Sequence, residues 1–190
     1  MDRPVNLSQR AADGAAFARI IAAESEQDVR RCYQCGKCTA GCPVAFAGDV
    51  MPHQVMRFLQ LGMKEDALGN RMIWLCSTCS TCTTRCPCGI DLARVMDCLR
   101  IAAREEGRTA AGREVALFNR TFLDSVRRFG RAHEASLAAL LNLKGGRPLK
   151  DIDLGIKFLA RGKLKLAPTR AGRGAVARLF AASRREEAGG

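Results

Sequence analysis

The sequence predicts an all-α fold, on three observations. Ala, Leu, Arg and Glu are common along the chain, and these residues favour helix over sheet. Apolar residues recur at helical spacing in several segments, whereas no convincing alternation of apolar and polar residues predicts a strand. Hydrophobic residues make up 47% of the 190 residues, which is enough for a packed core.

The N-terminal half is expected to contain a leader and then helices. Residues 1–13 are expected to form a loose leader, with a short helix following from Gly14 to about Glu24. Pro52 suits the first turn of the next helix, which Gly62 can end. A third helix is expected from an N-cap at Asp91 to a stop near Gly107.

The C-terminal half is expected to be helical and basic. An apolar stripe from Val115 to Phe129 predicts one helix, and residues 135–143 predict another. The Gly-Gly-Arg-Pro stretch at 145–148 breaks the pattern. A basic arm follows, and a last short helix is expected over residues 175–185.

The net charge of +12 is unevenly distributed. Residues 1–110 hold 14 Lys and Arg against 12 Asp and Glu, whereas residues 111–190 hold 17 against 7. Basic runs are usually a solvated face or a docking surface, and we expect this one to dock on an acidic partner. Nucleic acid would also attract such charge. However, the only aromatic residues after Phe129 are Phe158 and Phe180, which leaves few stacking platforms for bases.

The start of the chain and its hydropathy point to a cytoplasmic protein. No window approaches eighteen consecutive apolar residues, so no transmembrane segment is expected. The first residues lack the apolar stretch of a signal peptide. Thiols stay reduced in the cytosol and disulfides there are rare, so the ten cysteines indicate metal or redox chemistry.

Eight of these cysteines form two identical blocks that are 44 residues apart. Each block reads C-x2-C-x2-C-x3-C-P, the cluster-binding pattern of bacterial ferredoxins. The blocks contain Cys32, Cys35, Cys38 and Cys42, and then Cys76, Cys79, Cys82 and Cys86. The two-residue gaps wrap the chain around one face of a cubane, so that three thiolates reach three irons.

The fourth cysteine of each block is expected to cross over to the other cluster. In two-cluster ferredoxins that cysteine ligates the second cluster. The expected cofactors are therefore two 4Fe–4S clusters, one held by Cys32, Cys35, Cys38 and Cys86, and the other by Cys76, Cys79, Cys82 and Cys42. Such a pair of one-electron centres conducts electrons, and it has no open position for substrate and no evident acid or base. We therefore expect no catalytic residue.

Several residues near the blocks have two possible interpretations each. Cys88 and Cys98 are left over, and free cysteine is usually a small buried hydrophobe. Lys37 and Arg85 either offset cluster charge or are ordinary solvated side chains. The Gly, Ser and Thr residues between the ligands either let backbone approach sulfur or merely suit turns.

The sequence resembles a known family, the C-subunits of heterodisulfide reductases. The resemblance is carried by CYQCGKCTAGCPV at residues 32–44, and by IWLC at 73–76 with RCP at 85–87 and GID at 89–91. Weaker matches continue toward residue 180. The resemblance implies an alpha-helical ferredoxin with two 4Fe–4S clusters over residues 14–110. We expect residues 111–190 to be a helical, basic extension for docking on other subunits.

The family also implies partners. Its members pass electrons between a flavin-containing A-subunit and a cysteine-rich catalytic B-subunit, where a disulfide is cleaved. Related complexes in sulfur-oxidising bacteria act on sulfur compounds instead. Nothing in this chain resembles the cysteine-rich signature of the B-subunit, so we expect a protein that conducts electrons without catalysing the reaction itself.

Two other interpretations stay open at this level. One is an iron–sulfur subunit of a different oxidoreductase, of the glycolate, glycerol-3-phosphate or succinate type, since those relatives share the double block. The other is a zinc-dependent nucleic-acid-binding module. Zinc more often uses C-x2-C pairs, so two blocks with a tight third cysteine and a trailing proline favour clusters.

Overall fold

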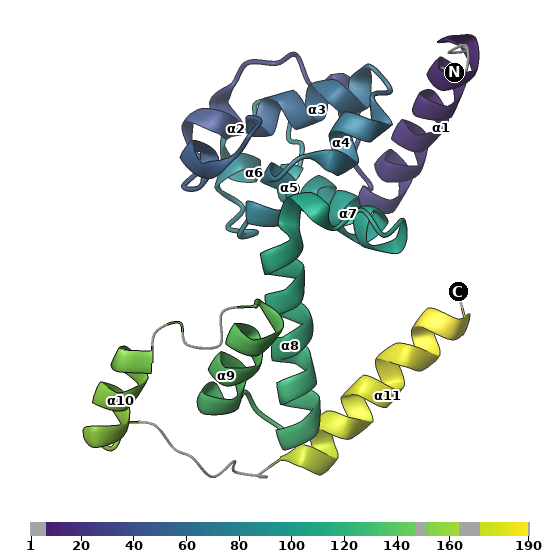
Figure 1. Ribbon diagram of the computed structural model, residues 1–190. Coiled ribbons are helices and arrows are strands. Elements are labelled where there is room, and N and C mark those ends of the chain that lie inside the picture. The colour runs from purple at the N-terminus through teal and green to yellow at the C-terminus, as the bar shows by residue number, and fades with distance from the viewer. Residues whose placement is uncertain (1–6, 147–149, 151, 164–171, 190) are drawn as a thin grey trace, which may run out of the picture. The chain divides into compact units, whose positions relative to one another are not determined.

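A computed structural model describes residues 7–146, 150, 152–163 and 172–189 of the chain (Figure 1). All regular elements in these residues are helices and none is a strand, which confirms the all-α prediction. The chain divides into two compact units, residues Met1–Arg113 and Glu114–Gly190, called unit 1 and unit 2 below. No helix in the described part of the chain is long and apolar enough to cross a membrane.

Unit 1 contains seven α-helices and three short 3-10 turns. The helices are α1 (Leu7–Ser25), α2 (Lys37–Ala40), α3 (Pro52–Gln60), α4 (Lys64–Gly69), α5 (Met72–Leu75), α6 (Thr81–Arg85) and α7 (Leu92–Glu105). The 3-10 turns are η1 (Val29–Arg31), η2 (Ala45–Ala47) and η3 (Ala110–Gly112).

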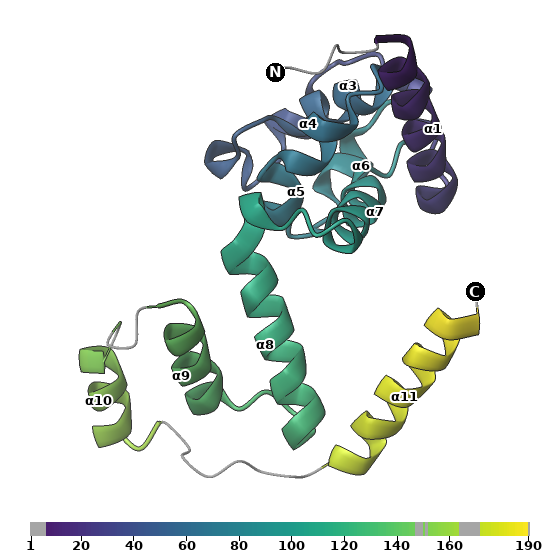
Figure 2. The same ribbon diagram turned by 45° about the vertical axis from the view of Figure 1, so that its right-hand side comes forward.

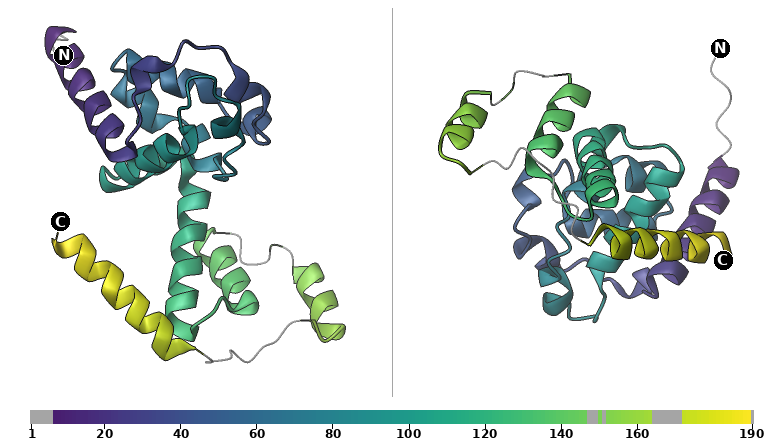
Figure 3. Two further views of the ribbon diagram at one scale, coloured as in Figure 1. Left: turned by 180° about the vertical axis from the view of Figure 1, so that it is seen from behind. Right: turned by 90° about the horizontal axis from the view of Figure 1, so that it is seen from below.

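The core of unit 1 lies among α1, α3, α4 and α7. Helix α1 packs against α7 and α3, and α4 packs against α3 and α7 (Figures 1 and 3). Ile21, Val55, Leu68 and Leu99, one from each helix, are fully buried at this junction. Each such side chain contributes about 1.5–3 kcal/mol when removed from water. This packing holds the loops that carry the cysteines.

Local sequence signals set several helix ends as expected. Pro52 is the first residue of α3, and the side chain of Asp91 accepts a hydrogen bond from the Arg94 N–H to cap α7. Helix α1 differs, because it begins at Leu7 and not at the expected Gly14. The segment in between, SQRAAD, contains good helix formers and no Pro or Gly, so the helix extends into the expected leader. Residues 1–6 of that leader lie outside the described residues.

Unit 2 contains α8 (Arg113–Phe129, which begins at the last residue of unit 1), α9 (Glu134–Lys144), α10 (Ile152–Ala160) and α11 (Arg173–Gly189). Helix α9 folds back beside α8 (Figure 2), where the His133 N–H donates to Ser125 Oγ at 3.1 Å. Helix α10 was missed by the sequence analysis, which expected a basic arm there. Its Ile152, Ile156 and Leu159 recur at helical spacing and are all exposed. An apolar helical pattern is therefore present in this segment.

Every buried hydrophobic residue in the described part of the chain lies between Phe17 and Ala103, in unit 1. The large apolar residues on α8 to α11 are mostly exposed, among them Phe118, Phe122 and Leu143. The described part of unit 2 therefore has helices without a closed hydrophobic core of its own.

Candidate metal centre

The two cysteine loops share an uncommon backbone conformation. Gln34 and Gly36 in the first block have φ angles of 64° and 74°, and Thr78 and Ser80, which stand 44 residues later, have 53° and 58°. Left-handed φ costs a non-glycine residue about 1–2 kcal/mol, so it persists only where the surroundings enforce it. Alternation of right- and left-handed residues turns backbone N–H groups into one concavity, which is a binding site for anions and iron–sulfur groups.

The thiols of the loops also have polar neighbours. Gln34 Nε2 lies 3.5 Å from Cys32 Sγ, and the Thr81 hydroxyl lies 3.4 Å from Cys79 Sγ, where it can donate to a thiolate. The hydrogen bond with Thr81 lowers the pKa of Cys79. These contacts favour sulfur that carries negative charge, which is the form that binds metal.

Burial has the opposite effect on three of the eight cysteines. Loss of contact with water raises the pKa of Cys38, Cys76 and Cys82. These thiols are protonated at neutral pH while they bind nothing, so ligation of a metal would release their protons. Cys35 and Cys79, the middle cysteines of the tight loops, are exposed, and the other predicted ligands are partly buried.

The two blocks contact each other through equivalent residues. Helices α2 and α6, one from each block, pack side by side (Figure 1). Gly41 and Arg85 stand at the same position of the repeat, and a Cβ atom on Gly41 would lie 2.7 Å from Arg85 Cδ. The duplicated sequence therefore folds into two halves that meet at matching positions.

The chain leaving each block lies beside the chain entering the other block. The Asp91 N–H, after the second block, donates to Gln27 Oε1 at 2.8 Å, before the first. In the other direction, the Arg71 N–H donates to both carboxylate oxygens of Asp49 at 2.9 and 2.8 Å. Gln27 and Arg71 are again 44 residues apart, whereas Asp49 and Asp91 are 42 apart. The two connections join equivalent segments, but the donor and acceptor roles are exchanged between them.

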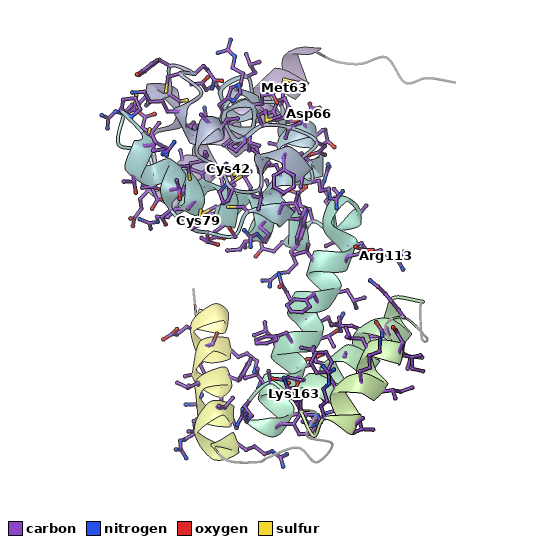
Figure 4. All side chains as sticks on the ribbon, turned by 90° about the vertical axis from the view of Figure 1, so that its left-hand side faces the viewer. Cys42, Met63, Asp66, Cys79, Arg113 and Lys163 are labelled. Carbon is purple, nitrogen blue, oxygen red and sulfur yellow. The ribbon has the colours of Figure 1, made fainter. Side chains whose placement is uncertain are left out.

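A thiol contact follows the same crossed arrangement. Cys88, two residues after Cys86, donates from Sγ to the carbonyl oxygen of Arg31, next to Cys32, at 3.0 Å. Figure 4 shows the side chains of unit 1, with Cys42 and Cys79 of the two blocks labelled.

A threonine after the third cysteine of each block ties the loop to the following helix. Thr39 Oγ1 lies 2.7 Å from His53 Nδ1 and accepts the His53 N–H at 3.2 Å, at the start of α3. Thr83 Oγ1 donates to Asp91 Oδ1 at 2.7 Å, at the N-cap of α7. His53 is therefore a structural residue, and each loop is fixed by the helix that follows it.

A side chain from the same two helices holds the first cysteine of each block. Gln60, the last residue of α3, donates to the carbonyl of Cys32 at 2.7 Å, and Arg100 on α7 donates to that of Cys76 at 3.1 Å. The sequence analysis missed both residues. They stand 40 residues apart and not 44, so the repeat alone does not reveal their equivalence.

Cys88 and Cys98 are neither of them buried, so the expectation of small buried hydrophobes is wrong for both. Within the described residues, no three His, Cys, Asp or Glu side chains lie close enough to hold a single metal ion. A cubane does not require such a group, because each thiolate binds a different iron.

Comparison with known proteins gives a family match for the cysteine-containing region. Residues 28–90 match the family described as a 4Fe-4S dicluster domain. An iron-sulfur C-subunit of the CoB--CoM heterodisulfide reductase of Methanocaldococcus jannaschii is 32% identical over 133 residues, which cover 69% of this chain and 67% of the relative. The chain belongs to the family of heterodisulfide reductase C-subunits.

Other members of this family match over shorter stretches. The iron-sulfur C-subunit of the CoB--CoM heterodisulfide reductase of Methanopyrus kandleri is 36% identical over 100 residues, 52% of either chain. The C-subunit of the Ferredoxin:CoB-CoM heterodisulfide reductase of Methanosarcina acetivorans is 39% identical over 77 residues, 40% of this chain and 31% of the relative. The match thus spans about half the length of the Methanopyrus relative.

As a member of this family the chain carries two 4Fe–4S clusters, as the sequence predicts. Its residues fit these groups. Thiolates are the ligands of 4Fe–4S clusters, and both loops have left-handed residues beside the cysteines, at Gln34, Gly36, Thr78 and Ser80, which favours backbone N–H groups that face a bound anion.

Proposed function

We propose that this chain is a non-catalytic electron-transfer subunit of a heterodisulfide-reductase-like complex. It relays single electrons between a flavin-containing A-subunit and a cysteine-rich B-subunit that converts a disulfide or another sulfur compound. The crossed connection of the two blocks, Gln27 with Asp91 and Arg71 with Asp49, is the observation that carries the proposal. It supports two redox groups held by one interlocked unit.

The proposed ligands follow from the same crossing. One cluster is held by Cys32, Cys35, Cys38 and Cys86, and the other by Cys76, Cys79, Cys82 and Cys42. Each cluster, when bound, supplies a one-electron redox centre. The contact of Cys88 with Arg31 supports the placement of Cys86 beside the first block, and the packing of α2 against α6 brings the two blocks together.

The exposed ligands suit a relay with two ends. Cys35 belongs to the first proposed set and Cys79 to the second, and both side chains are exposed. Each cluster therefore has a ligand at the surface, where a partner can approach. Tyr33, 63% exposed beside Cys35, adds a contact surface of the kind that is enriched in interfaces.

Unit 2 is proposed to be the docking extension, over residues 111–190. Its helix α8 exposes Phe118, Phe122 and Leu123, and an apolar surface of this kind is typical of a permanent interface. Residues 111–190 also hold 17 basic against 7 acidic residues, which supports an acidic partner surface. We place the complex in the cytoplasm, because thiols stay reduced there and can serve as cluster ligands.

Pairs of cysteine substitutions test the ligand sets. In the crossed assignment Cys42 and Cys79 share a cluster, so Cys42→Ala with Cys79→Ala should leave one intact cluster. Cys42→Ala with Cys35→Ala should damage both. Iron and acid-labile sulfide content, together with electron paramagnetic resonance of the reduced protein, counts the remaining clusters. Cys98→Ala is the control and should keep both. The reverse pattern would show that each block holds its own cluster.

Co-purification tests membership of the complex. The chain should bring down a flavoprotein and a cysteine-rich partner, and Val126→Asp with Phe129→Asp on α8 should release them. Asn119→Asp, a small change at an exposed position of α8, is the matched control. An intact complex with the double variant would contradict the docking role, and a lone dehydrogenase as partner would contradict the proposed complex.

A further inference from the structure

The first cysteine of the first block is held by a neutral side chain. Gln60 Nε2 donates to the carbonyl oxygen of Val29 at 3.1 Å and to that of Cys32 at 2.7 Å. Its Oε1 accepts from Arg57 Nη1 at 3.3 Å, on the side away from the cysteine carbonyl. Arg57 is exposed, so water screens its charge.

The first cysteine of the second block is held in the same way by a cation. Arg100 Nε donates to the carbonyl oxygen of Ile73 at 3.1 Å, and Nη2 donates to that of Cys76 at 3.1 Å. Val29 and Ile73 are 44 residues apart, as are the two cysteines. Gln60 and Arg100 therefore do the same structural job, and they differ by one unit of charge, because a guanidinium stays protonated in proteins.

One acidic residue opposes this charge. Arg100 Nη2 also lies 3.2 Å from Asp97 Oδ1, and the side chains are 21% and 44% exposed respectively. The guanidinium is the more buried partner, and it donates a hydrogen bond to the Cys76 carbonyl. Its positive charge therefore acts on the neighbouring sulfur in a less screened position than the charge of Asp97.

We propose that Arg100 raises the reduction potential of the cluster on Cys76, Cys79, Cys82 and Cys42 above that of the other cluster. Reduction adds one negative charge, which a nearby cation stabilises. An electron that enters the chain therefore resides preferentially on the second-block cluster, whose ligand Cys79 is exposed. This inference depends on the proposed ligand sets.

The expected size follows from one unit charge in a partly screened position. A change of about tenfold in the reduction equilibrium is of the right order, which for one electron is about 59 mV. Arg100→Gln should lower the potential of the second-block cluster by about this amount, because Gln can keep a carbonyl contact but has no charge. Arg100→Lys keeps the positive charge, so the potential of this cluster should stay close to that of the unchanged protein.

Two further variants test the charge without removing the guanidinium. Asp97→Asn removes the opposing charge and should raise the potential of the same cluster. Gln60→Arg introduces the cation at the equivalent place, so it should raise the potential of the first-block cluster. Each change should shift the reduction potential of one cluster. The reduction equilibrium constant of the other cluster should change by less than twofold.

The potentials are measured by redox titration followed by electron paramagnetic resonance, and single-cluster backgrounds assign the shifts. With Cys35→Ala only the second-block cluster stays intact, and Arg100→Gln should lower its potential. With Cys79→Ala only the first-block cluster stays intact, and Arg100→Gln should leave the potential of that cluster unchanged. If Arg100→Gln, Asp97→Asn and Gln60→Arg all leave the potentials unchanged in protein with two clusters, or shift both together, the inference is overturned. Protein in which the pairs of cysteine substitutions fail to give single clusters would instead overturn the ligand sets.

Discussion

Gly41 and Arg85 occupy the same position in the two cysteine blocks, and in the folded chain they contact each other. The Arg85 side chain lies across the space where a Cβ atom of residue 41 would stand, with Cδ 2.7 Å and Nε 2.9 Å from that position. The repeat is therefore symmetric in sequence spacing but asymmetric in chemistry at its own contact. One half supplies a long cation, and the other supplies the gap that receives it.

This contact predicts a coupled pair of substitutions. Gly41→Ala should cost about 1 kcal/mol, at the low end for overpacking, because the flexible Arg85 can move aside. Arg85→Ala opens the space, so Gly41→Ala should cost almost nothing in that background. Urea unfolding of anaerobically prepared protein measures both costs, and the difference gives the coupling. Equal costs in the two backgrounds would mean that Arg85 does not fill this space.

Helix α1 is predicted to depend on a close approach of two glycines. A Cβ atom on Gly14 would lie 1.9 Å from the carbonyl oxygen of Gly62, a backbone atom that cannot move aside alone. Gly14→Ala should therefore cost about 3 kcal/mol, near the top of the range for overpacking. In a chain of this size that lowers the melting temperature by roughly 6–12 °C.

Gly69→Ala is the matched control for this prediction. Gly69 lies in α4, has no atom within 4 Å of its missing Cβ, and should tolerate Ala with no loss of stability. Equal melting temperatures for Gly14→Ala and the unchanged protein would show that α1 does not pack against the turn at Gly62 as described.

The left-handed positions in the cysteine loops predict changes of opposite sign. Ser80→Gly removes the strain of a φ angle of 58° and should stabilise the second loop by about 1 kcal/mol. Gly36→Ala, at the equivalent place, introduces that strain where no atom crowds the new Cβ, and it should destabilise by about the same amount. Thermal unfolding of the protein with its clusters bound measures both shifts. Shifts of the same sign would argue against strain as the cause.

The link between Thr83 and Asp91 predicts a graded loss at the start of α7. Asp91→Ala removes both the N-cap and the acceptor for the Thr83 hydroxyl, for a cost of about 2 kcal/mol. Asp91→Asn keeps a cap and an acceptor oxygen and should cost much less. Denaturant midpoints of the two variants compare these costs. A loss as large for Asn as for Ala would point to the carboxylate charge and not to its hydrogen bonds.

Local features of this protein could be predicted from its sequence, because each depends on neighbours in the chain. Pro52 at the start of α3 and Asp91 at the N-cap of α7 were predicted from their own preferences. The two cluster-binding blocks were predicted from cysteine spacing alone. The start of α1 and the presence of α10 were not, because α1 has no clear start signal and the apolar pattern of α10 is short and lies among basic residues.

The sequence by itself determined the helical class, the 4Fe–4S cofactors and the family, since spacing and composition suffice for these, and it predicted the ligand cysteines. Only the tertiary structure decided which residues support each cysteine loop. Asp91 bonds Gln27 across 64 positions, and Gln60 and Arg100 reach cysteine carbonyls 28 and 24 positions away. Such partners are chosen by the packing of helices around a shared core, and no local pattern records that choice.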